Sequence, residues 1–314
     1  MKAYLFPGQG SQFVGMARDL FAEFKEAREV ISRADDVLGF AISEIMFADG
    51  MSEEESAKAL ASTDITQPAL YVHSMAAWAI LKKAGAVPSA TAGHSLGEYS
   101  ALAAAGAISF DDGLRAVRTR GHLMATADSG RPGTMAAVLG LDNDSVDAVC
   151  DAASTDDLVV KAANYNSPGQ VVISGDVAAV ERAIELATEK GAKKVIQLVV
   201  GGAFHSPLME SAREGLGDML DNLDIKTPDC PVYMNVTARP ETEPSRIREL
   251  LLQQLLSPVK WSQSLEAIKS DGLASFTEVG AGRVLSGLVR RTLGRDVEVA
   301  QAGTSADFQS ESTT

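Results

Sequence analysis

Short apolar runs alternate with stretches of helical periodicity over most of the chain. An apolar run at residues 4–6 predicts an early strand. Stretches with a period near 3.6 residues predict helices at residues 17–24, 24–38, 53–62, 67–84 and 110–127. Because predicted strands and helices alternate along the chain, we expect an α/β fold.

A turn-rich segment at residues 129–133 interrupts this run, and a unit with a different rhythm follows it. Its pattern predicts a strand, a helix, two strands, a helix and a strand, at residues 135–139, 142–153, 159–164, 170–174, 177–190 and 194–200. That order is typical of a ferredoxin-like unit. The larger α/β pattern then resumes, so we expect a ferredoxin-like insertion at residues 129–197.

The predicted insertion divides the large domain into two segments, residues 1–128 and 198–304. The polar residues 305–314 predict a disordered tail. With 314 residues, of which 46% are hydrophobic, the chain can bury about three quarters of its unfolded surface. This length suits one large domain that carries a smaller one.

Negative charge dominates the composition. The 28 Lys and Arg residues are outnumbered by 42 Asp and Glu residues, which gives a formal net charge of −14. This balance argues against nucleic acid binding, which needs a basic face. An anionic substrate would therefore need a local basic pocket.

The chain carries no sequence signal for a membrane or for an oxidising compartment. It has no run of about 18 apolar residues, so no membrane span is predicted, and its first segment is shorter than a signal peptide. Cys150 and Cys230 lack a paired spacing and indicate neither a disulfide framework nor a thiolate metal site. We expect a cytoplasmic protein that does not associate with membranes.

Residues 93–97, GHSLG, have the form Gly-x-Ser-x-Gly, which marks a nucleophile elbow. Such a strand-to-helix turn brings backbone segments close together, and glycines beside the serine tolerate this approach. A good helix former follows and ends at Gly106, so the N–H groups of a helix N-terminus would lie beside Ser95 and favour a developing oxyanion. The pattern is common by chance, so an ordinary structural turn is the alternative.

A serine hydroxyl needs a base to become a nucleophile, and the chain has four histidines. His205 follows an apolar strand and precedes a predicted helix, which is where an α/β fold would supply a base. His73 lies in an apolar helix and is expected in the core, while His122 is expected to be partly exposed. His94 adjoins Ser95, but adjacent side chains on a sharp turn point apart, so we expect His94 to orient its neighbours. No Asp or Glu stands out at a strand end as the acid of a triad.

Five motifs together resemble the malonyl-CoA:acyl-carrier-protein transacylase family. They occur in the family's order at residues 6–12, 93–99, 164–170, 202–206 and 278–285. The resemblance implies an α/β-hydrolase-like large domain with an inserted ferredoxin-like domain, which agrees with the independent interpretation of residues 129–200. Residues 1–4 and 235–240 are more similar to stand-alone acyltransferases that load polyketide synthases in trans. Fatty acid and polyketide biosynthesis therefore both stay open.

The resemblance implies a role for each matching catalytic position. Ser95 matches the nucleophile and His205 matches the base. The backbone N–H groups of Gln9 and Leu96 match the oxyanion hole. In this family a backbone carbonyl from the segment that holds Gln254 orients the histidine, which would explain why no triad acid stands out.

The resemblance also implies how the acyl group is bound. Arg120 matches the arginine that holds the malonyl carboxylate, because a guanidinium grips a carboxylate bidentately and stays charged. Without the motif, Arg118 and Arg120 would be interpreted as a solvated helix face. Phe204 would occlude a methyl branch on the substrate and favour malonyl modestly, and a core Phe that fills space is compatible with this. The substrate-binding set also includes Gln254, Asn164 and His94.

The implied reaction moves a malonyl group from malonyl-CoA to Ser95 and then to the phosphopantetheine thiol of an acyl carrier protein. We expect a monomer that needs no metal or redox cofactor. An acidic carrier protein would need a basic docking patch, for which a solvated face is the alternative; the candidates are Lys193, Lys194, Arg283, Arg290 and Arg291. Two other classes stay open. A serine acyl hydrolase or editing thioesterase would use the same Ser95 and His205, whereas a noncatalytic docking protein would not need them.

Overall fold

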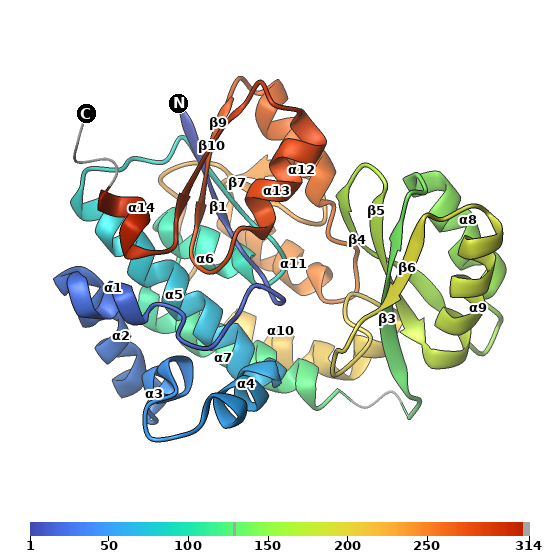
Figure 1. Cartoon of the computed structure of the whole chain (residues 1–314), viewed down its shortest axis with the longest axis horizontal. Coiled ribbons are helices and arrows are strands. Elements are labelled where there is room, and N and C mark those ends of the chain that lie inside the picture. The colour runs from blue at the N-terminus through green and yellow to red at the C-terminus, as the bar shows by residue number, and fades with distance from the viewer. Residues whose placement is uncertain (128–129, 310–314) are drawn as a thin grey trace.

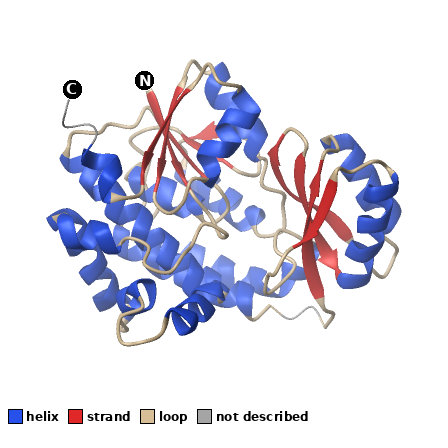
Figure 2. Ribbon diagram, viewed as in Figure 1, coloured by secondary structure: helices blue, strands red, loops and turns tan. Residues whose placement is uncertain are grey.

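Two β-sheets of different kinds organise the chain, a six-stranded sheet and a four-stranded sheet. The structure is a computed structural model that describes residues 1–127 and 130–309. Figures 1 and 2 show the larger sheet among most of the helices, with the smaller sheet at one end of the molecule. The predicted α/β class is confirmed.

The large sheet is mainly parallel and has the strand order β10-β9-β1-β2-β7-β8. Its strands are β1 (Lys2–Phe6), β2 (Ala90–Gly93), β7 (Val232–Met234), β8 (Arg239–Glu241), β9 (Ser275–Val279) and β10 (Glu298–Ala302). Only β8, at one edge, pairs antiparallel with its neighbour among the described strands of this sheet. The sheet therefore gathers segments that are far apart in the sequence.

Helices cover both faces of the large sheet, as the alternation of side chains along β1 requires. Ala3 and Leu5 belong to a core shared with α12 (Trp261–Ser270) and α13 (Val284–Leu293). Tyr4 and Phe6 point to the opposite face, where the core includes α5 (Thr63–Lys83) and α6 (Gly97–Ala104). The remaining helices of this part are α1 (Arg18–Glu23), α2 (Lys25–Leu38), α3 (Ile42–Phe47), α4 (Glu53–Ala61), α7 (Phe110–Ala125), the 3₁₀ helix η1 (Pro207–Ala212), α10 (Arg213–Asp221), α11 (Pro244–Gln254) and α14 (Ser305–Gln309).

The small sheet is antiparallel and has the strand order β4-β5-β3-β6. Its elements are β3 (Gly133–Leu139), α8 (Asn143–Ala153), β4 (Val160–Ser167), β5 (Gln170–Asp176), α9 (Val177–Glu189) and β6 (Lys194–Gln197). Ala136 and Val138 pack under α8 and α9, which lie on the outer side of the sheet in Figure 1. Met135 and Ala137 alternate with them and join the core of the large part. The inner face of the small sheet is thus turned toward the large part.

Most predicted elements occur within a few residues of their expected positions. The short helix α3 and the individual helices and strands after residue 212 were not predicted, and α5 begins at Thr63 instead of residue 67. The predicted strand at residues 194–200 ends at Gln197. None of the described helices is long and apolar enough to cross a membrane.

The prediction of a disordered tail is wrong for residues 305–309, which form α14. The carboxylate of Asp307 accepts hydrogen bonds from the backbone of Gly303 and Thr304, at 3.0 and 2.8 Å, and so holds the first turn. The Phe308 ring packs on Phe24 with 5.4 Å between ring centroids. Residues 310–314, and the predicted domain boundary at residues 128–129, lie outside the described residues.

Candidate active site

Three neighbouring strands of the large sheet end at one edge, and each leads directly into the site. β1 pairs in parallel with β2, with Phe6 opposite Gly93, and β2 pairs in parallel with β7. Because parallel strands end on the same side, the loops that follow them lie together. β1 leads to Gln9, β2 leads to Ser95, and β7 leads to Asn235. Side chains more than a hundred residues apart thereby meet at Ser95.

The turn at Ser95 has the strained geometry of a nucleophile elbow. Ser95 has a φ of 52°, which is in the left-handed region that side chains with a Cβ rarely adopt. A Cβ at Gly93 would lie 1.8 Å from the carbonyl oxygen of Gly97, and a Cβ at Gly97 would lie 2.1 Å from that of Phe6. Both flanking glycines are therefore required by the close approach of backbone, and α6 begins at Gly97, two residues after the serine.

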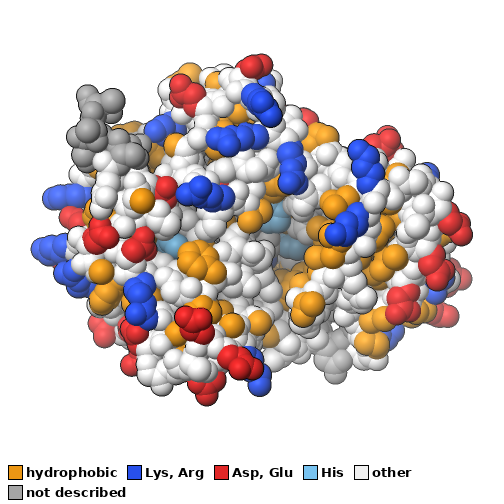
Figure 3. Space-filling model, in the orientation of Figure 1, with side chains coloured by type: hydrophobic (Ala, Val, Ile, Leu, Met, Phe, Trp, Pro, Cys, Tyr) orange, Lys and Arg blue, Asp and Glu red, His pale blue; other side chains and the backbone are white. Residues whose placement is uncertain are grey.

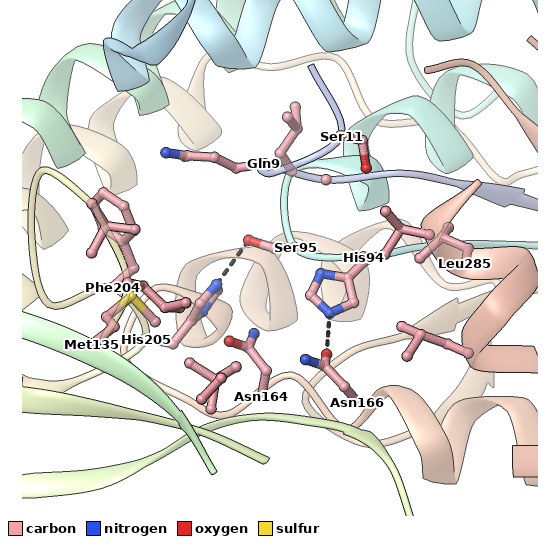
Figure 4. Close-up of a pocket in the computed structure, with 18 of the residues that line it drawn as sticks. Gln9, Ser11, His94, Ser95, Met135, Asn164, Asn166, Phe204, His205 and Leu285 are labelled. Carbon is pink, nitrogen blue, oxygen red and sulfur yellow. Dashed lines mark hydrogen bonds between the residues drawn. The ribbon is translucent and has the colours of Figure 1, made fainter. Parts of the chain in front are cut away.

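Ser95 and His205 form a hydrogen-bonded pair, with 2.8 Å between the serine Oγ and the histidine Nε2 (Figure 4). The Nδ1 atom of His205 lies 2.8 Å from the backbone carbonyl of Gln254, at the end of α11. A carbonyl can only accept, so Nδ1 carries the hydrogen and Nε2 is free to accept the serine proton. The Gln254 carbonyl occupies the position at which Ser-His-Asp triads have the carboxylate that orients the histidine.

The His205 ring is held in its neutral, proton-accepting form. Burial and then the positive charge of Arg120 lower the pKa of His205 to about 3. The hydrogen bond to Gln254 opposes this shift only in part. At neutral pH, His205 therefore meets the first requirement for a general base.

Arg120 is a buried cation beside the nucleophile. It comes from α7, is only 1% exposed, and its Nη2 lies 3.1 Å from the Oγ of Ser95. The guanidinium also donates to the side-chain oxygens of Gln67 and Gln254, each at 2.8 Å. All three acceptors are neutral, and burial lowers the pKa of Arg120. The arrangement can stabilise an anion that arrives next to Ser95.

A cavity of about 280 Å³ lies in front of Ser95 and is lined by both parts of the molecule. Figure 3 shows histidine atoms within a hollow between the two parts, with apolar side chains around it. The predicted residues that line the cavity are Gln9, His94, Ser95, Leu96, Arg120, Asn164, Phe204 and His205. The small sheet contributes Met135, Ala137 and Val172 to the opposite wall. Gln254 lies behind the site, fully buried, where it contacts Arg120 and His205.

The other three histidines and Asn164 lie at different places in the structure, and none is the hydrogen-bond partner of the Ser95 hydroxyl. His94 points away from the Ser95 hydroxyl, and its Nε2 is 2.8 Å from the Oδ1 of Asn166 (Figure 4). Asn164 lies at a register shift in β4, where a β-bulge can re-aim a side chain. His73 is buried and 2.8 Å from the carbonyl of Gly303, while His122 is exposed.

The five basic docking candidates, Lys193, Lys194, Arg283, Arg290 and Arg291, are all exposed. Figure 3 shows Lys and Arg side chains along the upper rim of the hollow. Arg291 donates to the side chain of Gln170 at 2.6 Å, which links α13 to the small sheet. The rim can therefore meet an acidic surface near the cavity.

Among the buried residues of the site that were not predicted are Gln67, Glu98 and Asn235. Gln67 is a polar residue inside the apolar helix α5, and this contrast is the only local signal for it. Asn235 accepts from the backbone N–H of Ser95 at 2.8 Å and donates to the carbonyl of Gly93 at 2.7 Å. Glu98 accepts from the backbone N–H of Asn235, and burial raises the pKa of this carboxyl. An acidic residue in a helix of small and apolar residues was the signal for Glu98.

Comparison with known proteins identifies the family. The model of the acyl transferase domain matches residues 3–310. The chain is 46% identical over 289 residues to the malonyl CoA-acyl carrier protein transacylase of Bacillus subtilis, an alignment that covers 92% of this chain and 89% of that protein. It is 44% identical over 307 residues to the protein of the same name from Staphylococcus aureus, with 98% and 97% covered.

Solved structures agree with the sequence comparison. An acyl carrier protein S-malonyltransferase from Vibrio cholerae superposes with a TM-score of 0.93 at 38% identity, and the match covers 99% of each chain. A malonyl-transacylase solved in complex with a type II PKS acyl carrier protein matches with a TM-score of 0.92 at 38% identity, over 98% of each chain. This chain belongs to the acyl transferase family and, within it, to the malonyl-CoA:acyl-carrier-protein transacylases.

Proposed function

We propose that this enzyme transfers a malonyl group from malonyl-CoA to the phosphopantetheine thiol of an acyl carrier protein through a malonyl-serine ester. The observation that carries this proposal is the buried guanidinium of Arg120, 3.1 Å from a serine hydroxyl that is itself hydrogen-bonded to a histidine. A nucleophile beside a buried cation suits an acyl group that ends in a carboxylate. The names of the relatives support the same reaction.

The first half-reaction forms the ester. His205 accepts the Ser95 proton on Nε2 while the serine Oγ forms a bond to the thioester carbonyl carbon. The carbonyl π electrons move to oxygen, and the backbone N–H groups of Gln9 and Leu96 stabilise this oxyanion. When the tetrahedral intermediate collapses, the C–S bond breaks and the CoA thiolate takes the proton from His205. The guanidinium of Arg120 holds the distal carboxylate throughout.

The second half-reaction reverses this sequence with a different thiol. His205 removes the proton from the phosphopantetheine thiol, and the sulfur attacks the ester carbonyl. Ser95 leaves and regains its proton from His205, so the enzyme returns to its starting state. The steps need no metal and no redox cofactor. The backbone N–H groups at the N-terminus of α6 are fixed in place and stabilise negative charge in both half-reactions.

The surrounding residues have supporting roles in this proposal. Phe204 bounds the space beside the α-carbon of the acyl group and disfavours a methyl branch. Gln254 acts from behind the site, where it orients His205 through its carbonyl and Arg120 through its amide oxygen. His94 and Asn164 line the cavity and bound the path of the pantetheine arm.

We also propose a finer description of the fold. The order β4-β5-β3-β6, with two helices on one face, supports a ferredoxin-like small domain at about residues 129–197. The mainly parallel sheet with its elbow after β2 supports an α/β-hydrolase-like large domain in two segments. We expect the enzyme to act as a monomer on carrier proteins of fatty acid or polyketide biosynthesis. The complex of a malonyl-transacylase with a type II PKS acyl carrier protein supports such a partner.

Intact mass measurement tests the proposal. The protein is incubated with malonyl-CoA and its mass is recorded before and after addition of a holo acyl carrier protein. We expect one malonyl group on the protein, which moves to the carrier thiol when the carrier is added. Free malonate without any loaded carrier would instead indicate a serine acyl hydrolase, because such an enzyme shares Ser95 and His205 but passes the acyl group to water.

A further inference from the structure

Glu98 is a fully buried acid that the proposed catalytic steps do not use. It lies in the first turn of α6, three residues after the nucleophile. Its Oε1 accepts from the backbone N–H of Asn235 at 2.5 Å, and its Oε2 accepts from the side-chain amide of Gln254 at 2.7 Å. Both partners are themselves fully buried. A buried carboxyl needs hydrogen-bond partners for its oxygens, because removing this group from water is costly.

The two partners of Glu98 are the residues that hold the rest of the site. The Oδ1 of Asn235 accepts from the backbone N–H of Ser95. The amide nitrogen of Gln254 also donates to the carbonyl of Ser95 at 3.0 Å, and its amide oxygen accepts from Arg120 at 2.8 Å. One carboxylate is therefore connected by single intermediates to the nucleophile and to the buried cation.

The orientation of the Gln254 side-chain amide depends on which groups face its oxygen and which face its nitrogen. Its oxygen must face Arg120, which only donates, so its nitrogen must face an acceptor on the other side. Glu98 supplies that acceptor, and it supplies a second one to the N–H of Asn235. A neutral amide at position 98 has one oxygen and one nitrogen, so it would present a donor to one of these two donors.

The geometry points to Glu98 as the positioning residue for malonyl recognition, which holds Arg120 in place through the side chain of Gln254. This inference rests on the proposed function, because it assigns Arg120 to the malonyl carboxylate. Glu98 should therefore contribute more to the transfer of malonyl, whose distal carboxylate Arg120 binds, than to the transfer of acetyl, which has no such carboxylate.

Glu98→Gln tests this role, since it keeps the volume and removes one acceptor. Rates are measured for malonyl and acetyl transfer to a holo acyl carrier protein, in the wild-type and Arg120→Ala backgrounds. In the wild-type background we expect malonyl kcat/KM to fall roughly 10- to 100-fold, the range for a buried donor that loses its acceptor, and acetyl transfer to fall several-fold less. In the Arg120→Ala background the same substitution should lower malonyl transfer by less than about threefold, because the group it positions is gone. Equal losses in both backgrounds would overturn the inference.

Two further variants separate positioning from general destabilisation. Glu278→Gln is the matched control, because Glu278 is another buried glutamate that accepts from two backbone N–H groups, those of Leu285 and Ser286 at 2.9 and 2.7 Å. We expect it to lower thermal stability without changing the malonyl-to-acetyl ratio; a shift as large as that of Glu98→Gln would overturn the inference. Gln254→Met keeps the carbonyl that contacts His205 and removes the link.

Gln254→Met decides the question if Glu98→Gln does not fold. We expect Gln254→Met to lower malonyl transfer more than acetyl transfer, and this difference should disappear in the Arg120→Ala background. A difference that persists there would overturn the inference. A wild-type enzyme without malonyl transfer would overturn the proposed function and this inference together. An active wild-type enzyme with additive losses would overturn the role of Glu98 alone.

Discussion

The carboxyl edge of the large sheet and the inner face of the small sheet meet at one cavity, but they are built differently. The large part supplies hydrogen-bonded, buried polar groups, among them Ser95, His205 and Arg120. The small sheet faces them with apolar side chains, such as Met135 and Val172, and with the uncharged amides of Asn164, Asn166 and Gln170. The comparison indicates that reactivity is built into one part, while the other shapes the space in which the acyl group and its carrier arm lie.

Backbone strain follows the same division. Ser95 and His205 both have positive φ values, 52° and 56°, although both carry a Cβ. Such conformations cost about 1–3 kcal/mol each and persist where the surrounding structure determines them. In the small sheet, the positive-φ residues within the described range 130–197 are all glycines, for which this conformation is inexpensive. Ala17, Ala48 and Ala238, which do not line the cavity, also have positive φ, so this backbone strain is a property of the large part and includes the catalytic pair.

The largest effect is expected from the nucleophile itself. Ser95→Ala removes the only atom that forms the ester, while the turn can retain its backbone. We expect no covalent malonyl adduct by intact mass, with an unchanged thermal melting temperature to within a few degrees. An ester-linked adduct on the variant would show that the nucleophile lies elsewhere.

The next largest effect is expected from Arg120→Ala. Loss of the partner of a buried carboxylate costs on the order of 2–5 kcal/mol, which corresponds to roughly 30- to 5,000-fold in malonyl transfer. Acetyl transfer should fall much less, because acetyl has no carboxylate to bind. The measurement is kcat/KM with each acyl-CoA, and equal losses for the two would assign Arg120 a structural role.

A substitution at Phe204 tests the shape of the cavity, because this side chain lines the cavity from the segment that joins the two parts. We expect Phe204→Ser to raise methylmalonyl transfer relative to malonyl by roughly tenfold, because one methylene in an apolar pocket is worth only about 1–3 kcal/mol. Both acyl-CoA substrates are measured in direct competition on one carrier protein. An unchanged ratio would place the wall against branched substrates elsewhere in the cavity.

A substitution on the small sheet should affect the reaction less. Val172→Ala removes two buried methyl groups, worth about 1.5 kcal/mol of folding free energy at ~0.8 kcal/mol each. We expect the malonyl adduct still to form in full and kcat/KM to fall by less than about tenfold. Loss of the adduct in a folded Val172→Ala protein would contradict the division between the two parts.

The smallest effect is expected from pH. Burial and Arg120 lower the pKa of His205 to about 3, so the folded protein keeps this ring neutral where an ordinary histidine, with a pKa of about 6.5, would gain a proton. The proton-accepting form is lost only as pH falls toward 3. Single-turnover acylation by acetyl-CoA should therefore be nearly constant between about pH 5 and about pH 8. A fall with a midpoint near 6.5 would show that His205 keeps its ordinary pKa.

Local patterns in the sequence predicted much of this molecule. The elements of the small unit were predicted in the right order, because periods of 2 and 3.6 residues alternate clearly there. Ser95 was proposed because residues 93–97 have the form Gly-x-Ser-x-Gly, and His205 because it follows an apolar run and precedes a predicted helix. The fold class followed from the same alternation of strands and helices.

What could not be predicted depends on contacts between distant segments. The backbone of Asn235 and the side chain of Glu98 are separated by 137 residues, and nothing local marks them as partners. Gln67 and Arg120 are 53 residues apart and meet only because α5 packs against α7. The helix at residues 305–309 depends likewise on the distant residue Phe24, so its polar sequence alone indicated disorder.

The most direct test of the central claim is the amount of free CoA that the enzyme releases from malonyl-CoA when no carrier protein is present. Covalent transfer through Ser95 requires one acylation per molecule and then an acceptor thiol. We expect a rapid burst equal to the concentration of enzyme, followed by a stall that ends when a holo acyl carrier protein is added. Continuous release of CoA at the rate of carrier loading, with free malonate as the product, would contradict the claim.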